Sequence, residues 1–179
     1  MNVILEQQIH SDTLKLIAQK ILLAARTAPK GRGVDNTVLA MVEGESIKEI
    51  SEKLKELGKK YDQPGFMRDA ENILSANILL LFGSKIKSMG LKKCGMCGFK
   101  DCAEKDIHPL IPCVFNTGDL GIAIGSAVSV AMDDRVDNRI MYSVGQAVLE
   151  MQLLGPEVKI AYGVPLSAYA KDPYFDRRS

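Results

Sequence analysis

Four cysteines fall within one stretch of twenty residues, and this clustering constrains the chain more than any other feature. The spacing is C-x2-C-x4-C-x10-C, formed by Cys94, Cys97, Cys102 and Cys113, and no other cysteine occurs. A two-residue spacer lets two sulfur atoms face the same point, so the first pair can wrap a metal centre. Gly95 and Gly98 follow the first two cysteines, and we expect them to supply the positive φ that a tight loop needs.

Three kinds of site would use four cysteines. Disulfides suit a secreted chain, but the first residues form no signal peptide, and a chain of 179 residues does not need covalent staples. A structural zinc site usually shows two matched pairs, whereas Cys102 and Cys113 make an asymmetric second half. A four-iron, four-sulfur (4Fe–4S) cluster takes four thiolates, typically three close together and one from further along. We therefore predict a 4Fe–4S cluster, with zinc as the alternative.

The cysteine stretch also carries a family resemblance. The segment from Cys94 to Cys102 resembles the C-G-x-C-G-x-x-x-C segment of four-cysteine iron–sulfur domains, such as those of corrinoid iron–sulfur proteins. Across its whole length, the chain resembles a family of prokaryotic proteins described as containing a ferredoxin domain. That family is similar to the nitroreductase-like flavoproteins. The resemblance implies a nitroreductase-like scaffold with an inserted iron–sulfur loop.

Length and composition favour one domain, residues 1–179, with residues 90–115 as an embedded iron–sulfur loop. Hydrophobic residues make up 46% of the chain, and the net charge is only +1 with both signs interspersed. This balance provides no cluster of positive charge of the kind that binds nucleic acid. The longest apolar runs are too short or too glycine-interrupted to span a membrane. Together with free-thiol chemistry, these features predict a cytoplasmic protein that binds neither nucleic acid nor a membrane.

Hydrophobic periodicity predicts an alternation of helices and strands. The expected helices cover 11–28, 46–60, 64–74, 118–132 and 137–153. The expected strands cover 37–42, 77–82 and 159–164. This mixed order predicts an α+β fold, described equally as a mixed α/β sandwich.

A candidate flavin site follows the first predicted helix. The segment 24–32 resembles the first flavin-binding stretch of nitroreductases, in which a helix ends in a small-residue and proline turn. The implied contacts with flavin mononucleotide (FMN) come from Arg26, Ala28, Pro29, Lys30 and Arg32. Three cations within seven residues would suit a phosphate, which arginine grips with two hydrogen bonds. The alternative is that these cations only interact with the carboxyl end of the helix.

The resemblance extends to the carboxyl-terminal part of the chain. The segment 161–167 resembles the strand and Gly-x-Pro turn that contacts the flavin ring in that superfamily, which implies roles for Gly163 and Pro165. Lys171 or Arg177 would supply a late phosphate contact. The small-residue segment 119–131 resembles the central helix at the dimer interface, which implies a homodimer. Tight helix packing within one chain is the alternative explanation for those small residues.

Two functions follow from these patterns. The first is a redox protein in which electrons pass between a 4Fe–4S cluster and FMN, which would make it an FMN-dependent oxidoreductase with a redox partner protein. The second is a non-enzymatic protein in which the cluster or a zinc ion is a structural clip or redox sensor. Neither pattern specifies a catalytic side chain or an organic substrate.

Overall fold

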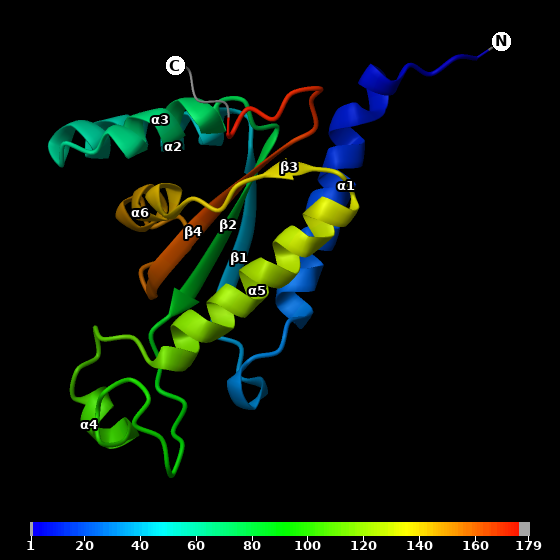
Figure 1. The fold of residues 1–179 in the computed structure, drawn as a ribbon. Helices are drawn as coiled ribbons and strands as arrows, with labels where there is room; N and C mark the ends of the chain where they lie inside the picture. Colours follow the sequence, from blue (N-terminus) through cyan, green and yellow to red (C-terminus); the bar gives the residue numbers. More distant parts are fainter. Residues whose placement is uncertain (1, 176–179) are drawn as a thin grey trace.

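A four-stranded antiparallel sheet forms the centre of the protein (Figure 1). The computed structural model describes residues 2–175. The strand order is β1-β2-β4-β3, with the strands at Thr37–Glu43, Ile78–Lys85, Val158–Ser167 and Asp137–Asn138 for β1, β2, β4 and β3 respectively. The central strand β2 is buried from Ile78 to Ser84. Both faces of β2 can be buried because its residues Ile78–Phe82 are all apolar, so neither face carries a polar side chain that needs water.

Helices cover both faces of the sheet. One face carries α1 (Glu6–Thr27) and α5 (Val114–Asp133). The other face carries α2 (Glu45–Lys60), α3 (Pro64–Ile73) and α6 (Tyr142–Glu150). Alternate residues of β2 serve the two cores, with Leu80 and Phe82 facing one and Leu79 and Leu81 facing the other. The predicted mixed α/β sandwich is confirmed.

Helices α1 and α5 pack closely on each other. Buried α1 residues recur at helical spacing, namely Leu14, Ala18, Ile21 and Ala25. The Ser126 hydroxyl of α5 donates a hydrogen bond to the Ala24 carbonyl of α1 over 3.1 Å. By length and composition alone α5 would also cross a membrane, but its buried side forms part of the core under the sheet. The small residues of α5 therefore serve packing within one chain along that side.

The sequence misplaced one helix and several boundaries. The predicted helix 137–153 is wrong at its start, because Asp137 and Asn138 pair with β4 as a strand and α6 begins only at Tyr142. Helix α1 begins five residues earlier than the predicted position 11, and α5 begins at Val114 rather than at 118. Helix α6 lies so close to β4 that a Cβ at Gly145 would stand 1.8 Å from the Ala161 carbonyl oxygen. That contact explains the glycine in mid-helix.

Candidate functional site

All four cysteines belong to the connection between β2 and α5, residues 86–113, which we call the cysteine loop. The loop extends beyond the end of the sheet, away from the helices that cover it (Figure 1). Cys94, Cys97 and Cys102 are partly buried, and Cys113 is buried at the residue that precedes α5. None of the four forms a disulfide. All four thiols are therefore free to lose a proton and bind a metal as thiolates.

Glycine geometry shapes the turn between the first cysteines. Gly95 and Gly98 have φ angles of 99° and 90°, which confirms the expected positive φ. The Gly98 amide donates to the Gly95 carbonyl over 3.0 Å and closes the turn. The loop then forms one short helix, α4 (Cys102–Asp106), which is capped by the Asp101 carboxylate, since this accepts a hydrogen bond from the Glu104 amide over 2.9 Å. The sequence analysis did not predict this helix.

One buried side chain ties the two ends of the cysteine loop together. Asn116 is 1% exposed and lies in the first turn of α5. Its Oδ1 accepts from the backbone amides of Lys87 and Cys113, both over 3.1 Å. Its Nδ2 donates to the Lys87 carbonyl over 3.0 Å. The loop therefore leaves and re-enters the body of the protein at one fixed point, and Cys113 is held there.

The donor set fits a metal cluster by its chemistry, while the thiols are not gathered into a closed site. Four reduced thiols on one loop are the ligand set that iron–sulfur clusters use. Within residues 2–175, no three His, Cys, Asp or Glu side chains lie close enough together to hold a metal ion. A metal site and the fold around it commonly form together, so an open loop is compatible with this donor set.

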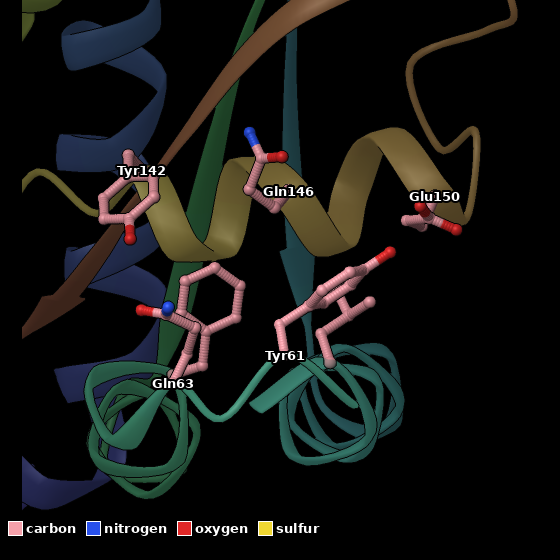
Figure 2. Close-up of a pocket in the computed structure, with 7 residues that line it drawn as sticks. Tyr61, Gln63, Tyr142, Gln146 and Glu150 are labelled. Atoms are coloured by element: carbon pink, nitrogen blue, oxygen red, sulfur yellow. The ribbon is translucent and has the colours of Figure 1, made fainter. Parts of the chain in front are cut away.

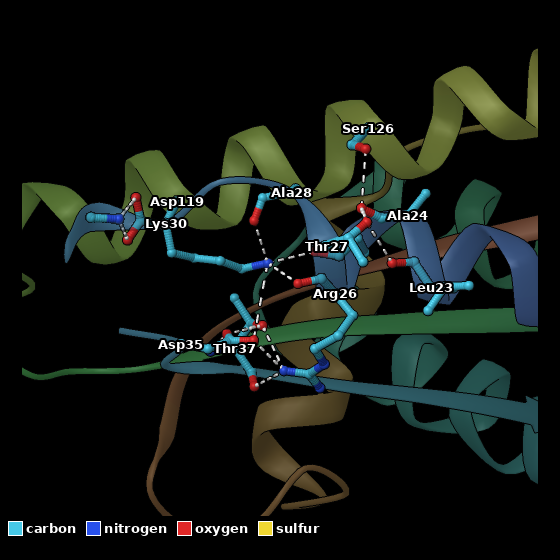
Figure 3. Close-up of polar contacts among 12 residues, drawn as sticks. Leu23, Ala24, Arg26, Thr27, Ala28, Lys30, Asp35, Thr37, Asp119 and Ser126 are labelled. Carbon is cyan, nitrogen blue, oxygen red and sulfur yellow. Dashed lines mark hydrogen bonds and ion pairs between the residues drawn. The ribbon is translucent and has the colours of Figure 1, made fainter. Parts of the chain in front are cut away.

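Two of the predicted phosphate-binding cations, Lys30 and Arg32, lie in the turn after α1, residues 28–36, which we call the cation turn, and the third, Arg26, lies in the last turn of α1. The Lys30 ammonium donates to the carbonyls of Ala25, Arg26 and Ala28 at 2.7–2.8 Å (Figure 3). The Lys30 side chain is only 4% exposed. An ammonium has three N–H donors, and all three are used here to satisfy carbonyls at the end of the helix. In this arrangement Lys30 keeps no donor for a phosphate.

Arg26 and Arg32 are less fully committed. The Arg26 guanidinium pairs with the Asp35 carboxylate (Figure 3). Burial raises the pKa of Asp35, but hydrogen bonds from Thr37 and Arg26 outweigh it, so the pKa is lowered overall. Arg32 donates from Nη1 to the Met89 carbonyl over 2.8 Å. A guanidinium has five N–H donors, so each arginine retains capacity for an anion.

The cation turn and the cysteine loop are neighbours. Besides the bond from Arg32 to Met89, the Gly31 amide donates to both oxygens of Asp119 on α5, over 3.0 and 3.1 Å. A Cβ at Gly31 would stand 2.8 Å from the Phe115 ring, so the turn rests directly on the start of α5. The sequence analysis missed the roles of Asn116 and Asp119. Their signal was polarity, since both interrupt an otherwise apolar helix.

Of the other predicted flavin contacts, Ala28 and Pro29 belong to the cation turn, whereas Gly163, Pro165 and Lys171 do not. Ala28 is buried in the core below α1 and α5, and Pro29 is exposed beside it. Gly163 faces Val144 of α6, on the opposite face of the sheet, and Pro165 shares that side by alternation. The segment 168–175 that contains Lys171 lies at the opposite end of the sheet (Figure 1). Arg177 lies outside the described residues. All these flavin contacts stay predictions.

A pocket of about 370 Å³ opens elsewhere, between α6 and the turn that joins α2 to α3. Its lining is aromatic and amide-rich, with Leu57, Tyr61, Gln63, Phe66, Tyr142, Gln146 and Glu150. Figure 2 shows Tyr61 and Gln63 on one side of this pocket and Tyr142, Gln146 and Glu150 on the other. No cysteine or cation of the candidate site lines it. It is therefore separate from the candidate site.

The fold is shared with flavoproteins of known structure. A structure described as a nitroreductase in complex with FMN from Desulfovibrio desulfuricans superposes with a TM-score of 0.60 at 12% identity, covering 92% of this chain and 79% of that one. A BluB-like flavoprotein from Clostridium difficile 630 gives a TM-score of 0.58 at 18% identity, with 92% and 83% covered. A nitroreductase with bound FMN from Desulfitobacterium hafniense gives 0.58 at 17% identity, with 90% and 82% covered. The predicted nitroreductase-like fold is confirmed.

Sequence comparison identifies the family. Residues 111–177 match the family described as "Uncharacterized protein containing a ferredoxin domain" (DUF2148). A protein from Archaeoglobus fulgidus, described as an uncharacterized protein, is 38% identical over 180 residues, which cover 96% of each chain. The ferredoxin-domain description indicates a redox role. The chain belongs to this family of ferredoxin-domain proteins, on a nitroreductase-like scaffold.

Proposed function

We propose that this is a cytoplasmic redox protein that holds one 4Fe–4S cluster on the thiolates of Cys94, Cys97, Cys102 and Cys113. The observation that carries the proposal is the presence of all four thiols, reduced, on a single loop of a ferredoxin-domain protein. The buried Cys113 directly precedes α5, and the other three cysteines lie in the projecting part of the loop and are partly buried. When bound, the cluster supplies one-electron exchange.

Loop closure and cluster loading would be a single event. Cys113 is fixed by the hydrogen bonds of Asn116, so the segment with the first three thiols would move toward it. Gly90, Gly95 and Gly98 all have positive φ, and such positions tolerate backbone rearrangement at low cost. Zinc on the same thiols is the alternative occupant.

The cation turn supports FMN as a second redox centre. Arg26 and Arg32 would hold the phosphate with their remaining N–H donors. Lys30 would take part only if it gave up a carbonyl of α1, because its ammonium already serves three. The contacts of Arg32 with Met89 and of Gly31 with Asp119 place this turn against the cysteine loop and α5, where electrons would pass between the two centres.

A homodimer would complete such a flavin site. The segment that contains Lys171 lies at the far end of the sheet from the cation turn, so one chain cannot bring both to one ligand (Figure 1). The exposed side of α5 carries small and apolar residues beside Thr117, Ser129 and Asp133, namely Gly118, Gly121, Ile122, Gly125 and Met132. Such a side lets a second helix approach closely. We therefore propose that two chains meet through α5 and share the flavin.

Anaerobic analysis of purified protein tests the proposal. We expect about four irons and four sulfides per chain, with a broad brown absorbance. Replacing Cys97 by Ser should abolish most of the iron, whereas the neighbouring Met96→Leu control should retain it. A yellow fluorophore released by denaturation would support FMN. One zinc per chain without iron in the anaerobic sample would refute the cluster.

A structural clip or redox sensor is the second candidate. It is favoured by the position of the thiols, because no cysteine lines the pocket between α6 and the α2–α3 turn. A redox centre that only exchanges electrons with a partner needs no substrate pocket, so both candidates fit this geometry. Reversible bleaching by dithionite supports electron transfer. Irreversible loss of colour on reduction supports the clip.

A further inference from the structure

The cysteine loop carries several strongly exposed apolar side chains. Leu110, Ile107 and Met96 are 76%, 75% and 69% exposed, which makes them the three most exposed large apolar side chains in residues 2–175. All three lie in the cysteine loop, and Ile111 beside them is 44% exposed. Exposed apolar groups that gather in one region mark interaction sites more often than singly scattered ones do.

The same region carries the positive charge of the chain. Five lysines and three carboxylates lie in the cysteine loop, while the whole chain has 23 basic and 22 acidic residues. The loop therefore holds the excess positive charge, and the remainder of the chain is net negative. From Lys85 to Lys100 there are five lysines and no acidic residue.

The carboxylates of the loop are used internally, and its lysines are exposed except Lys105, which is 2% exposed and pairs with the Asp106 carboxylate over 3.5 Å. Asp101 caps α4, Glu104 accepts from the Lys100 amide, and Asp106 accepts from the Ser88 hydroxyl. Four lysine side chains make no ion pair with any described residue, and all four are exposed: Lys87, Lys92, Lys93 and Lys100. The surface that a partner meets is therefore apolar side chains beside unpaired cations, on a loop that projects from the body (Figure 1).

We propose that the cysteine loop is the docking surface for an electron-carrier protein with an acidic face. This inference rests on the redox function proposed above, because a carrier must reach the sulfur-ligated centre closely. The lysines flank Cys94 and stand between Cys97 and Cys102, so the charge that attracts the partner surrounds the thiols. Opposite charge on the carrier would steer encounter, and the apolar side chains would supply contact area once water is expelled.

Other anionic partners fit the loop less well. Proteins that bind nucleic acid through its phosphates use arginine as well as lysine, yet the loop has no arginine and the chain is almost neutral. Membrane surfaces are usually bound by a long amphipathic helix, whereas the helix here, α4, has five residues. A second copy of the chain would bring the same lysines opposite themselves.

The experiment measures binding of a purified acidic ferredoxin to the anaerobically loaded protein, by titration calorimetry at 50 and 200 mM salt. The Lys92→Glu/Lys93→Glu double variant should raise the Kd at least about tenfold, and salt should weaken the wild-type complex several-fold. Lys59→Glu/Lys159→Glu, which changes the same charge on exposed lysines elsewhere, should leave the Kd within about twofold. Leu110→Gln should also weaken binding, whereas Leu16→Gln on exposed α1 surface should not.

Dithionite reduction without any carrier separates this inference from the proposed function. A protein that dithionite reduces reversibly but that does not bind the ferredoxin overturns the docking surface and leaves the redox assignment standing. A protein that dithionite does not reduce overturns the redox assignment and the identity of the partner with it. Equal weakening by both double charge variants, or tighter binding to anionic phosphatidylserine vesicles than to the ferredoxin, also overturns the docking surface.

Discussion

The central sheet and the cysteine loop obtain their order in opposite ways. In β2 every residue from Ile78 to Ser84 is buried, and both neighbouring strands hydrogen-bond to it along its length. In the cysteine loop, residues 86–101 form no helix or strand, and Met96, Ile107 and Leu110 are exposed. The sheet is stabilised by burial and backbone pairing, which the loop largely lacks. The loop therefore depends on its clamp at Asn116 and, in our proposal, on its metal.

This difference implies different local stabilities. Segments with few buried contacts and few protected backbone hydrogen bonds open at lower free energy than the core around them. A ligand that binds only the ordered form stabilises that form by its free energy of binding. Metal loading should therefore order the loop and leave the sheet almost unchanged.

The largest expected effect contrasts two leucines. Leu81 is fully buried in β2, so Leu81→Ala should lower the free energy of unfolding by about 2–5 kcal/mol. Leu110 in the loop is 76% exposed, so Leu110→Ala should change it by less than about 0.5 kcal/mol. Urea unfolding followed by circular dichroism measures both. Similar losses in the two variants would contradict the contrast.

The next effect tests the clamp between the two regions. Asn116→Ala would leave the Lys87 amide and carbonyl and the Cys113 amide without their side-chain partner. We expect a loss of about 2–3 kcal/mol, since each buried polar group without a partner costs about 1–3 kcal/mol and part of this site can admit water. Urea unfolding gives the change. Hydrogen exchange at Lys87 and Cys113 should accelerate as well.

A matched asparagine provides the control for the clamp. Asn72 on α3 is only half-buried, and its side chain makes no hydrogen bond with a described residue. Asn72→Ala should therefore change the free energy of unfolding by less than about 0.5 kcal/mol. If Asn116→Ala were equally mild, the cysteine loop would not be held by this side chain.

Much of the sheet body was predictable from the sequence because each element carried its own local signal. The apolar run at 78–82 predicted a buried strand, and Pro64 predicted the first turn of α3, where it stands. The two-residue strand β3 was missed because it forms only through pairing with β4, which is distant in the sequence. A local pattern cannot report such a contact.

The candidate site was predictable in composition but not in arrangement. The four cysteines and three cations were found by residue type and spacing. Their partners were not, because Asn116 and Asp119 act through contacts with segments 29 and 88 residues away. Lys30 shows the same limit, since its sequence position suited a phosphate, whereas in the structure its ammonium contacts the carbonyls at the end of its own helix.

A smaller effect is expected at the end of α1. Lys30→Met keeps the apolar stem but removes the ammonium that serves three carbonyls. Stability should fall by about 1–2 kcal/mol, because hydrogen bonds from a charged donor are stronger than neutral ones, but one of these bonds is exposed and the other two are only part-buried. Thermal unfolding measures the loss. The control Lys59→Met, on the exposed last turn of α2, should leave the melting temperature almost unchanged. Equal losses of stability in the two variants would show that Lys30 does not cap α1.

The smallest effect is a pH dependence from Asp35. Hydrogen bonds from Thr37 and the charge of Arg26 lower its pKa in the folded protein despite partial burial. A lowered pKa contributes stability above the unfolded value near 3.9, and this contribution is lost as pH falls through the folded pKa. The advantage of wild type over Asp35→Asn should therefore be constant near neutrality and shrink below about pH 4, by less than about 1 kcal/mol because the pair is partly exposed. Urea unfolding from pH 6 to pH 2.5 measures it. Arg26→Gln should reduce the same dependence, and an advantage that persisted unchanged at pH 2.5 would show that the Asp35 carboxylate does not stabilise the cation turn by its charge.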